Sequence, residues 1–190
     1  DIKIFWKKGL EYFLGNIKKD LENINVKFDV WTSEQDLRDR NLVEEALEKL
    51  INLGYTYEQE GALFLKTTLF GDEKDRVLVK QDGSYTYFMP DIAYHLDKLN
   101  RGYDKLIDVF GADHHGYVSR LKSAVTMLGQ DSDKLSVLLI QMVRAIKNGE
   151  EYKISKRTGN TITLNDLVEE SGKDASRYFF VSRSLDTQVD

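Results

Sequence analysis

The stretch KLIDVFGADHHGYVSRLKSAVTMLG, residues 105–129, decides the fold class of this chain. It begins with an apolar run, turns at Gly111 and continues with apolar residues at helical spacing. This order of buried strand, glycine turn and amphipathic helix is typical of the crossover between two parallel strands. A second apolar run, residues 134–143, predicts the next strand, and residues 163–184 predict two short helices separated at Gly172. The sequence therefore predicts an α/β protein that contains half of a doubly wound domain.

The residues before position 86 follow a different pattern, with helices first and antiparallel strands after them. The expected elements are helices over residues 3–22 and 34–53, a short strand over 26–31, and strand pairs over 55–68 and 75–88. Turns are expected at Gly61 and at Asp82-Gly83, because Asp-Gly is a strong hairpin signal. This part is therefore predicted to be an α+β region that looks like an insertion into the doubly wound domain.

The composition excludes several classes of site. The 27 basic and 32 acidic residues give a net charge of −5, so no overall field attracts nucleic acid and any such contact needs a local patch. The absence of cysteine excludes disulfides, thiolate zinc sites and cysteine nucleophiles, and it fits a reducing cytoplasm. No apolar run approaches the roughly 20 residues that span a bilayer. The chain does not begin with methionine, so we expect it to start inside a longer protein.

A first group of polar residues follows the predicted strand, in GADHHGY, residues 111–117. Open α/β sheets bind their ligands at the carboxyl ends of parallel strands, which favours a site at Gly111. Asp113, His114 and His115 are the candidate ligand-binding groups. Two alternatives stay open: a metal site, although a third ligand at useful spacing is absent, and simple capping of the following helix.

A second group lies in YFMPD, residues 87–91, where Tyr87 is expected to end a strand and Pro90 to begin a helix. Asp91 then falls in the first helical turn, where it could serve only the helix dipole, a contribution of about 0.3–1 kcal/mol. Alternatively, its carboxylate faces the same crevice as Gly111 and pairs with a cationic ligand, for which a guanidinium offers a bidentate match. The phenol of Tyr87 could orient such a planar cation or stack on it.

A third group is the basic loop EYKISKRTGN, residues 151–160. Lys153 and Lys156 lie on either side of Ser155, and Thr-Gly-Asn follows, so the loop could close over phosphates and supply charge as a leaving group departs. The alternative is a solvated basic hairpin tip. A Walker-type phosphate loop, G-x-x-x-x-G-K-[ST], does not occur in the sequence.

Taken in this order, the three groups resemble the class I aminoacyl-tRNA synthetases and, among them, the bacterial-type arginyl enzymes. The resemblance rests on residues 85–129, on KISKRTGN at 153–160 and on residues 163–184. KISKR is similar to the family's lysine signature, usually written K-M-S-K-S, and keeps both lysines and the serine. The implied fold is a Rossmann-like class I catalytic domain with an inserted α+β connective region. The implied parts are the connective insertion over 1–85, the second half of the catalytic domain over 86–150, and the lysine loop with the following helical segment over 151–190.

The resemblance also implies a role for each matching residue. Arginine would be read by Tyr87, Asp91 and His115; ATP would be contacted by Gly111, Asp113, His114, Lys153 and Lys156; and Lys153, Ser155 and Lys156 would form the catalytic loop. Lys156 would stabilise the pentavalent transition state. No resident metal site is implied, and Mg²⁺ would arrive with ATP.

The activity implied by the resemblance is that of an arginine-tRNA ligase. L-arginine would be activated by ATP to arginyl-adenylate and transferred to tRNA(Arg) by a cytoplasmic, monomeric enzyme with no membrane contact. The family's His-x-Gly-His element is absent, since the only histidines are His95, His114 and His115, so we expect a central fragment that is inactive alone. Two alternatives stay open. One is another nucleotidyltransferase of the same superfamily, against which Tyr87 and Asp91 argue, and the other is a non-catalytic synthetase-like binding module.

Overall fold

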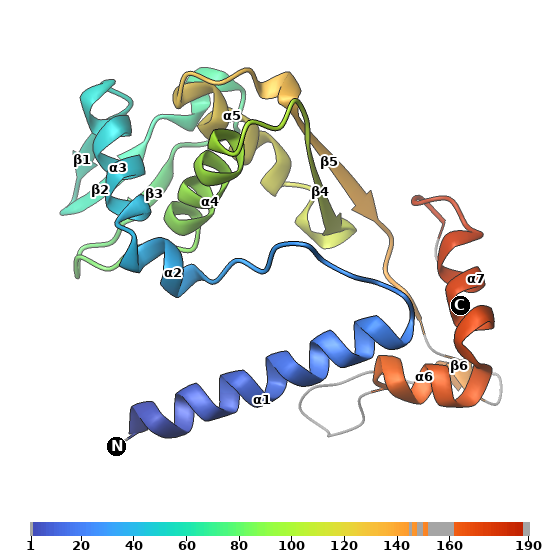
Figure 1. Ribbon diagram of the computed structural model, residues 1–190. Helices are drawn as coiled ribbons and strands as arrows, with labels where there is room; N and C mark the ends of the chain where they lie inside the picture. Colours follow the sequence, from blue (N-terminus) through green and yellow to red (C-terminus); the bar gives the residue numbers. More distant parts are fainter. Residues whose placement is uncertain (1, 145, 148–149, 152–161, 188–190) are drawn as a thin grey trace. The chain divides into compact units, whose positions relative to one another are not determined.

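The computed structural model describes residues 2–144, 146–147, 150–151 and 162–187, and it divides into two compact units (Figure 1). The larger unit comprises residues 32–140, and the smaller combines residues 1–31 with 141–190. The three-part domain division expected from the sequence concerns the family's architecture and stays a prediction. Among the described residues, no helix is both long and apolar enough to cross a membrane.

The larger unit begins with helices and a small antiparallel sheet. Its first elements are α2 (Glu34–Asp39), α3 (Leu42–Asn52), β1 (Thr56–Gln59), β2 (Ala62–Leu65), the short 3-10 helix η1 (Thr67–Phe70) and β3 (Arg76–Val79). The sheet order is β1-β2-β3 with antiparallel pairing throughout. Glu60 and Gly61 have φ values of 51° and 76°, and two successive positive φ angles are the conformation that a tight hairpin turn requires. The predicted turn at Gly61 is confirmed.

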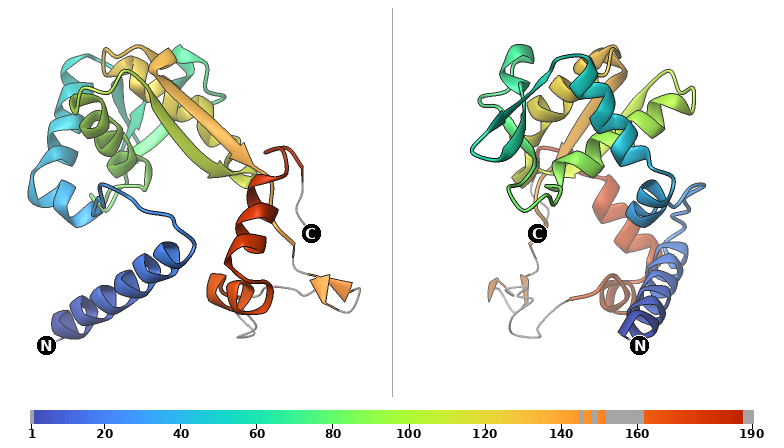
Figure 2. Two further views of the ribbon diagram at one scale, coloured as in Figure 1. Left: turned by 45° about the vertical axis from the view of Figure 1, so that its right-hand side comes forward. Right: turned by 90° about the vertical axis from the view of Figure 1, so that its left-hand side faces the viewer.

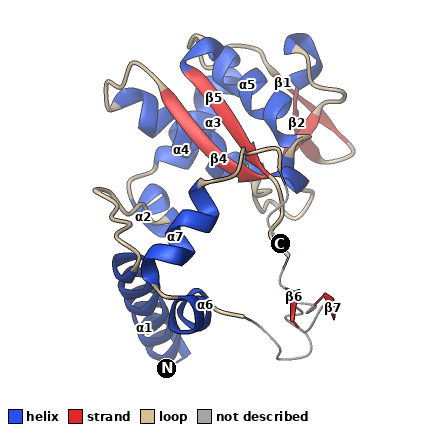
Figure 3. Ribbon diagram, turned by 90° about the vertical axis from the view of Figure 1, so that its right-hand side faces the viewer, coloured by secondary structure: helices blue, strands red, loops and turns tan. Residues whose placement is uncertain are grey.

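The second half of the larger unit is an α/β crossover. Its elements are α4 (Phe88–Asn100), β4 (Leu106–Gly111), the 3-10 helix η2 (Ala112–His114), α5 (Tyr117–Met127), the 3-10 helix η3 (Ser132–Lys134) and β5 (Leu135–Ile140). β4 and β5 pair in parallel, with Leu106 opposite Leu135 and Gly111 opposite Ile140 (Figure 3). The strand, helix and parallel strand predicted from residues 105–129 and 134–143 are therefore confirmed.

The two faces of the β4–β5 pair differ in burial. Leu106 and Leu135 are buried in the core, whereas Ile107 and Val109, which alternate with the inward residues of β4, are 56% and 59% exposed. The core is formed by buried side chains from α3, β2, β3, α4, α5 and β5: Val43, Ala46, Leu50, Leu65, Leu78, Met89, Ile92, Leu121, Val125 and Leu135. One apolar core therefore joins the small antiparallel sheet to the crossover, and α4 lies at its centre.

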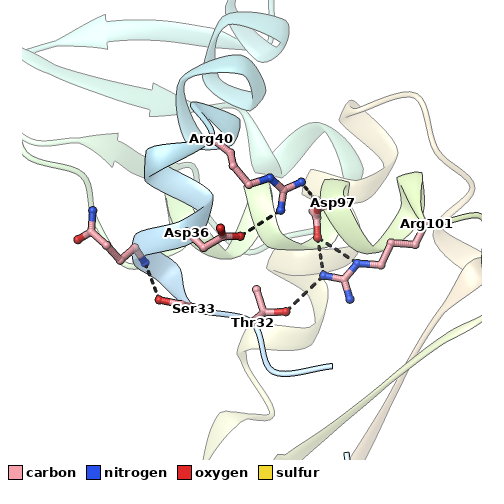
Figure 4. Close-up of polar contacts among 7 residues, drawn as sticks. Thr32, Ser33, Asp36, Arg40, Asp97 and Arg101 are labelled. Carbon is pink, nitrogen blue, oxygen red and sulfur yellow. Dashed lines mark hydrogen bonds and ion pairs between the residues drawn. The ribbon is translucent and has the colours of Figure 1, made fainter. Parts of the chain in front are cut away.

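Ion pairs attach α2 to α4 on the surface of the larger unit (Figure 4). Arg40, which directly follows α2, reaches Asp36 of α2 at 3.1 Å and Asp97 of α4 at 3.0 Å. Arg101 donates to the other oxygen of Asp97 and to the hydroxyl of Thr32. Burial alone would raise the pKa of Asp97, but the hydrogen bonds from the two guanidinium groups outweigh it and lower the pKa. Asp97 therefore stays ionised as the centre of this network.

The smaller unit is mainly helical. It contains α1 (Ile2–Asn23), the two-residue strands β6 (Ile146–Lys147) and β7 (Glu150–Glu151), α6 (Leu164–Ser171) and α7 (Lys173–Val181). α6 and α7 are separated at Gly172, as predicted, and they meet there at a sharp angle (Figure 2). Thr163 and Asp166 form a capping box at the start of α6. The end of α1 is held by polar contacts, in which Asn165 donates to Asp20 at 2.7 Å and Arg177 donates to the carbonyl of Ile24.

Four sequence predictions about local structure need correction. The predicted helix over 34–53 is two helices, because Asn41 takes a left-handed conformation with φ 57° between α2 and α3. Residues 26–31 form no strand, since no neighbouring strand pairs with them, and Phe28 and Trp31 contact each other edge to face instead. The second predicted strand pair is reduced to β3 and a single bridge from Val79 to Tyr85. Tyr87 therefore ends no strand, and α4 begins at Phe88, two residues before Pro90.

Candidate functional site

The first turn of α4 carries Asp91, and Tyr87 immediately precedes the helix. The two residues are four positions apart, and the backbone N–H of Asp91 donates to the carbonyl of Tyr87, so one helical turn connects them. Tyr87 is 89% exposed, whereas Asp91 is half-buried. The structure thus places an exposed phenol one helical turn before a half-buried carboxylate.

Asp91 is held by Tyr117, the first residue of α5. The hydroxyl of Tyr117 donates to Oδ2 of Asp91. Burial raises the pKa of the Tyr117 phenol, and the hydrogen bond to Asp91 and its negative charge raise it further, so the phenol is a neutral donor at physiological pH. No Lys, Arg or His of the described residues forms an ion pair with Asp91. Its carboxylate therefore has a neutral partner and retains acceptor capacity.

Aromatic rings and one guanidinium surround the Tyr117 ring. Phe88 and Phe110 lie edge to face against it, with ring centroids 5.9 and 6.3 Å away. The guanidinium of Arg120 lies over the Tyr117 ring, 4.8 Å from its centroid, and 5.7 Å from that of Phe88. Nε of Arg120 is buried and has no hydrogen-bond partner among the described residues. Residues from α4, β4 and α5 thus meet around the hydroxyl that holds Asp91.

The carboxyl end of β4 presents the other predicted polar residues. Gly111 has extended backbone, and Asp113, His114 and His115 follow it with exposed side chains. His114 lies 3.7 Å from Asp113, and both side chains are more than 60% exposed. The ring of His114 also lies near Phe110, with centroids 6.1 Å apart. Phe110 contacts Tyr117, and Tyr117 holds Asp91, so side-chain contacts connect the end of β4 to the Asp91 side chain.

Two alternative roles were left open for His114 and His115, capping of the following helix and metal binding. α5 begins after Gly116, and neither histidine side chain hydrogen-bonds a backbone group of α5 within the described part of the chain. The capping alternative is therefore wrong for these two residues. No group of three or more His, Asp or Glu residues suited to a metal ion occurs among the described residues. The exposed imidazoles are left available to a ligand.

A buried polar cluster next to this region was not predicted from the sequence. Nδ1 of His95 lies 2.7 Å from the carbonyl oxygen of Asp91, and its Nε2 lies 2.7 Å from Asp108. Lys98 donates to the other oxygen of Asp108 at 2.6 Å. Burial alone would raise the pKa of Asp108, but the hydrogen bonds from His95 and Lys98 outweigh it and lower the pKa. One signal was present: Asp108 interrupts an apolar strand at an inward-facing position.

Two features remain, the predicted basic loop and a hollow that the sequence did not predict. Lys153, Ser155 and Lys156 of the basic loop lie outside the described residues. A hollow of about 490 Å³ lies against β1, β2 and β3, and its lining contains none of the predicted site residues. It is an open depression on the antiparallel sheet, remote in sequence from the charged groups at the ends of α4 and β4, so we give the Asp91 region priority on chemical grounds.

Comparison with known proteins agrees with the fold and the motifs. Residues 1–183 match the family model described as tRNA synthetases class I (R), catalytic domain. The chain is 54% identical over 189 residues to the arginine-tRNA ligase of Bacillus subtilis and 53% identical to that of Staphylococcus aureus, covering 100% of the chain and 34% of each relative. The chain thus spans about a third of the length of these relatives.

Solved structures show the same relationship. A crystal structure described as an arginyl-tRNA synthetase from Campylobacter jejuni superposes with a TM-score of 0.86 at 45% identity, over 94% of this chain and 39% of that one. The Thermus thermophilus arginyl-tRNA synthetase shares the fold, with a TM-score of 0.74 at 17% identity over 90% of this chain and 39% of that one. The chain belongs to the class I arginyl-tRNA synthetase catalytic-domain family.

Proposed function

We propose that the protein containing this chain is an arginine-tRNA ligase. The observation that carries the proposal is the carboxylate of Asp91, which is half-buried at the start of α4 and has a neutral phenol in place of a cation as its partner. A partly desolvated carboxylate gains most from a ligand cation, and a guanidinium can pair with both of its oxygens at once. The names of the relatives supply the same ligand, arginine.

In this proposal, the residues around Asp91 read the substrate side chain. Asp91 receives the guanidinium, the exposed phenol of Tyr87 orients or stacks on the planar cation, and His115 lines the same pocket. A lysine substrate would lack the two-pronged geometry, and a neutral side chain would leave the carboxylate without its cation. Such a site therefore discriminates against other amino acids by orders of magnitude.

The proposed reaction has two steps. The carboxylate of arginine attacks the α-phosphate of ATP, which forms arginyl-adenylate and releases pyrophosphate. A hydroxyl of the terminal ribose of tRNA(Arg) then attacks the arginyl carbonyl, which forms the ester and releases AMP. Catalysis of this kind depends mainly on positioning and electrostatic stabilisation. Gly111, Asp113 and His114 are proposed to lie beside the adenosine, with Lys153 and Lys156 on the phosphates and Ser155 between them. Mg²⁺ would enter with ATP, and we infer a cytoplasmic, monomeric enzyme.

The experiment that tests the function is ATP-pyrophosphate exchange by the full-length protein, measured for each of the twenty amino acids with and without tRNA. Exchange that depends on L-arginine alone is the expected result. Exchange with a different amino acid would contradict the reading of the Asp91 site. Failure with all twenty, in the presence of tRNA, would favour a non-catalytic binding module.

The basic loop can be tested separately by Lys156→Ala. If Lys156 stabilises charge on the departing phosphates, the single-turnover rate of adenylate formation falls by about a hundredfold or more, while the affinity for ATP changes much less. Rapid-quench kinetics and equilibrium binding of ATP measure the two quantities. Lys147→Ala, on β6 of the same region, is the matched control. An unchanged single-turnover rate would remove the catalytic role of Lys156.

A further inference from the structure

Tyr117 is the residue next to the candidate site to which neither the motifs nor the resemblance gives a role. We propose that Tyr117 is a positioning residue for arginine recognition, whose hydroxyl fixes the carboxylate of Asp91 in the orientation that accepts a guanidinium. The inference rests on the proposed function, because it assumes that Asp91 contacts the substrate. It adds a residue on α5 to a site otherwise built from α4 and the end of β4.

The geometry of the carboxylate explains why a fixed orientation matters. A guanidinium binds a carboxylate through two parallel N–H···O bonds, one to each oxygen, so the plane of the carboxylate decides whether both can form. The terminal torsion of an aspartate is broad, and a free Asp91 would sample many planes. The Tyr117 hydroxyl donates to Oδ2 only, which leaves Oδ1 and a second lone pair on Oδ2 for the ligand.

The residues around Tyr117 hold its side chain, and therefore its hydroxyl, in one orientation. Phe88 and Phe110 pack on its ring, and the guanidinium of Arg120 lies over its face, so the ring is held by contacts from three elements. The phenol is neutral, and it therefore orients Asp91 without cancelling its charge. A lysine or arginine in the same place would compete with the substrate for the carboxylate. Asp108, with His95 and Lys98 on its two oxygens, shows the result of such internal pairing.

The test is Tyr117→Phe in the full-length protein, assayed by arginine-dependent ATP-pyrophosphate exchange. The substitution keeps the ring and its packing and removes only the hydroxyl. We expect the KM for arginine to rise about tenfold, a typical effect of losing a hydrogen bond to a charged group, while the KM for ATP stays unchanged. An equal rise in both KM values, or no rise in either, would overturn the proposal.

Tyr85→Phe is the matched control, because Tyr85 also donates its hydroxyl to a carboxylate, that of Glu44 at 3.3 Å, within the same unit. It removes the same atom from the same kind of pair, away from Asp91. The KM for arginine should stay unchanged in this variant. A rise equal to that of Tyr117→Phe would show that the effect comes from general loosening of the unit, which contradicts a positioning role.

The double variant Asp91→Asn with Tyr117→Phe separates positioning from structure. If Tyr117 acts through Asp91, its removal adds little to the loss already caused by Asp91→Asn. A full additional tenfold loss would show that Tyr117 acts elsewhere and would overturn the inference. If Asp91→Asn alone leaves the KM for arginine unchanged, the proposed role of Asp91 is wrong, whatever the result for Tyr117→Phe. If Asp91→Asn raises the KM for arginine but Tyr117→Phe does not, this inference is wrong and the proposed function is unaffected.

Thermal unfolding of each variant is the control for a loss of stability. If Tyr117→Phe unfolds at the assay temperature, 4-fluorophenylalanine at position 117 replaces it, because the fluorine fills the place of the hydroxyl without a proton to donate. The same selective rise in the KM for arginine is expected. A normal KM for arginine in a folded fluoro variant would overturn the proposal.

Discussion

Asp91 and Asp108 both contact His95, Asp91 through its backbone carbonyl and Asp108 through its carboxylate, and the two carboxylates differ in their partners. Asp108 is 8% exposed and receives hydrogen bonds from His95 and Lys98, so its charge is matched by groups of the protein. Asp91 is half-buried and receives a hydrogen bond from a neutral phenol. His95 joins the two, since its other nitrogen contacts the carbonyl of Asp91. The difference teaches that a carboxylate with an internal cation supports the fold, whereas one without such a cation is available to a ligand.

Asp108→Asn tests the structural half of this comparison and has the largest expected effect. The amide cannot balance the ammonium of Lys98, which lies 2.6 Å from Oδ1 of Asp108, and breaking a largely buried ion pair costs about 3 kcal/mol. We expect the free energy of unfolding to fall by this amount in urea denaturation, with little change in arginine affinity. Asp104→Asn, on the exposed loop before β4, is the control. A loss of arginine affinity without a loss of stability would reverse the assignment of the two carboxylates.

Low pH should remove the contribution of the Asp108 carboxylate to the free energy of unfolding, as Asp108→Asn does. Its pKa in the folded protein lies below the ordinary value of 3.8, so its stabilising effect is complete above that value and is lost as the pH falls further toward the folded pKa. The difference in unfolding free energy between the native protein and Asp108→Asn should therefore be constant at neutral pH and should narrow below pH 3.8. Urea denaturation of both proteins across this range measures it. If this difference in unfolding free energy disappears between pH 6 and 8 instead, a group other than Asp108 controls its pH dependence.

Asp91→Asn tests the binding half. The amide oxygen can still accept from Tyr117, so we expect little change in stability, but the negative charge that binds a guanidinium is lost. Arginine affinity should fall at least tenfold, about 1.4 kcal/mol, while ATP affinity stays nearly intact. Isothermal titration calorimetry with each ligand measures both. Equal arginine affinity in the native protein and the variant would remove Asp91 from the site.

Asp97→Asn should have the smallest effect of these substitutions. Asp97 pairs with Arg40 and Arg101, and both guanidinium groups are partly exposed to solvent, unlike the mostly buried partners of Asp108. Water screens such pairs, so we expect a loss of about 1 kcal/mol in the free energy of unfolding. Urea denaturation in low and high salt checks it, because only screened surface pairs weaken markedly with salt. A loss as large as that of Asp108→Asn would show that exposure does not separate the two networks.

The elements with strong periodic patterns could be predicted from the sequence, and the context-dependent ones could not. The apolar run of β4 and the helical spacing of α5 each have a local cause, and both are confirmed. Gly111 itself is the last residue of β4, and the chain turns in the 3-10 helix η2 that follows it. The predicted strand over 26–31 failed because a strand needs a neighbour to satisfy its backbone, and alternation alone does not supply one. The long helix over 34–53 failed because a single left-handed residue, Asn41, divides it.

The candidate site shows the same limit. Asp91 and Tyr87 could be selected from the sequence, Asp91 from its place in the first turn of a helix and the pair from the resemblance to the arginyl enzymes. Tyr117 and His95 could not, because they contact their partners across 26 and 13 positions of the chain. Tyr117 lies in GADHHGY, but no local spacing connects it to Asp91. Their roles depend on the packing of α4 against β4 and α5.

The sequence by itself determined the class of the fold, the order of its elements and the residue types that could bind a cation or a phosphate. These properties depend on periodicity, turn chemistry and motif spacing, all of which act over a few residues. Only the tertiary structure decided which carboxylate is paired with a cation of the protein and which can accept a cationic ligand. That decision depends on the distances between side chains from different elements, because electrostatic and hydrogen-bonding energies vary steeply over a few ångströms.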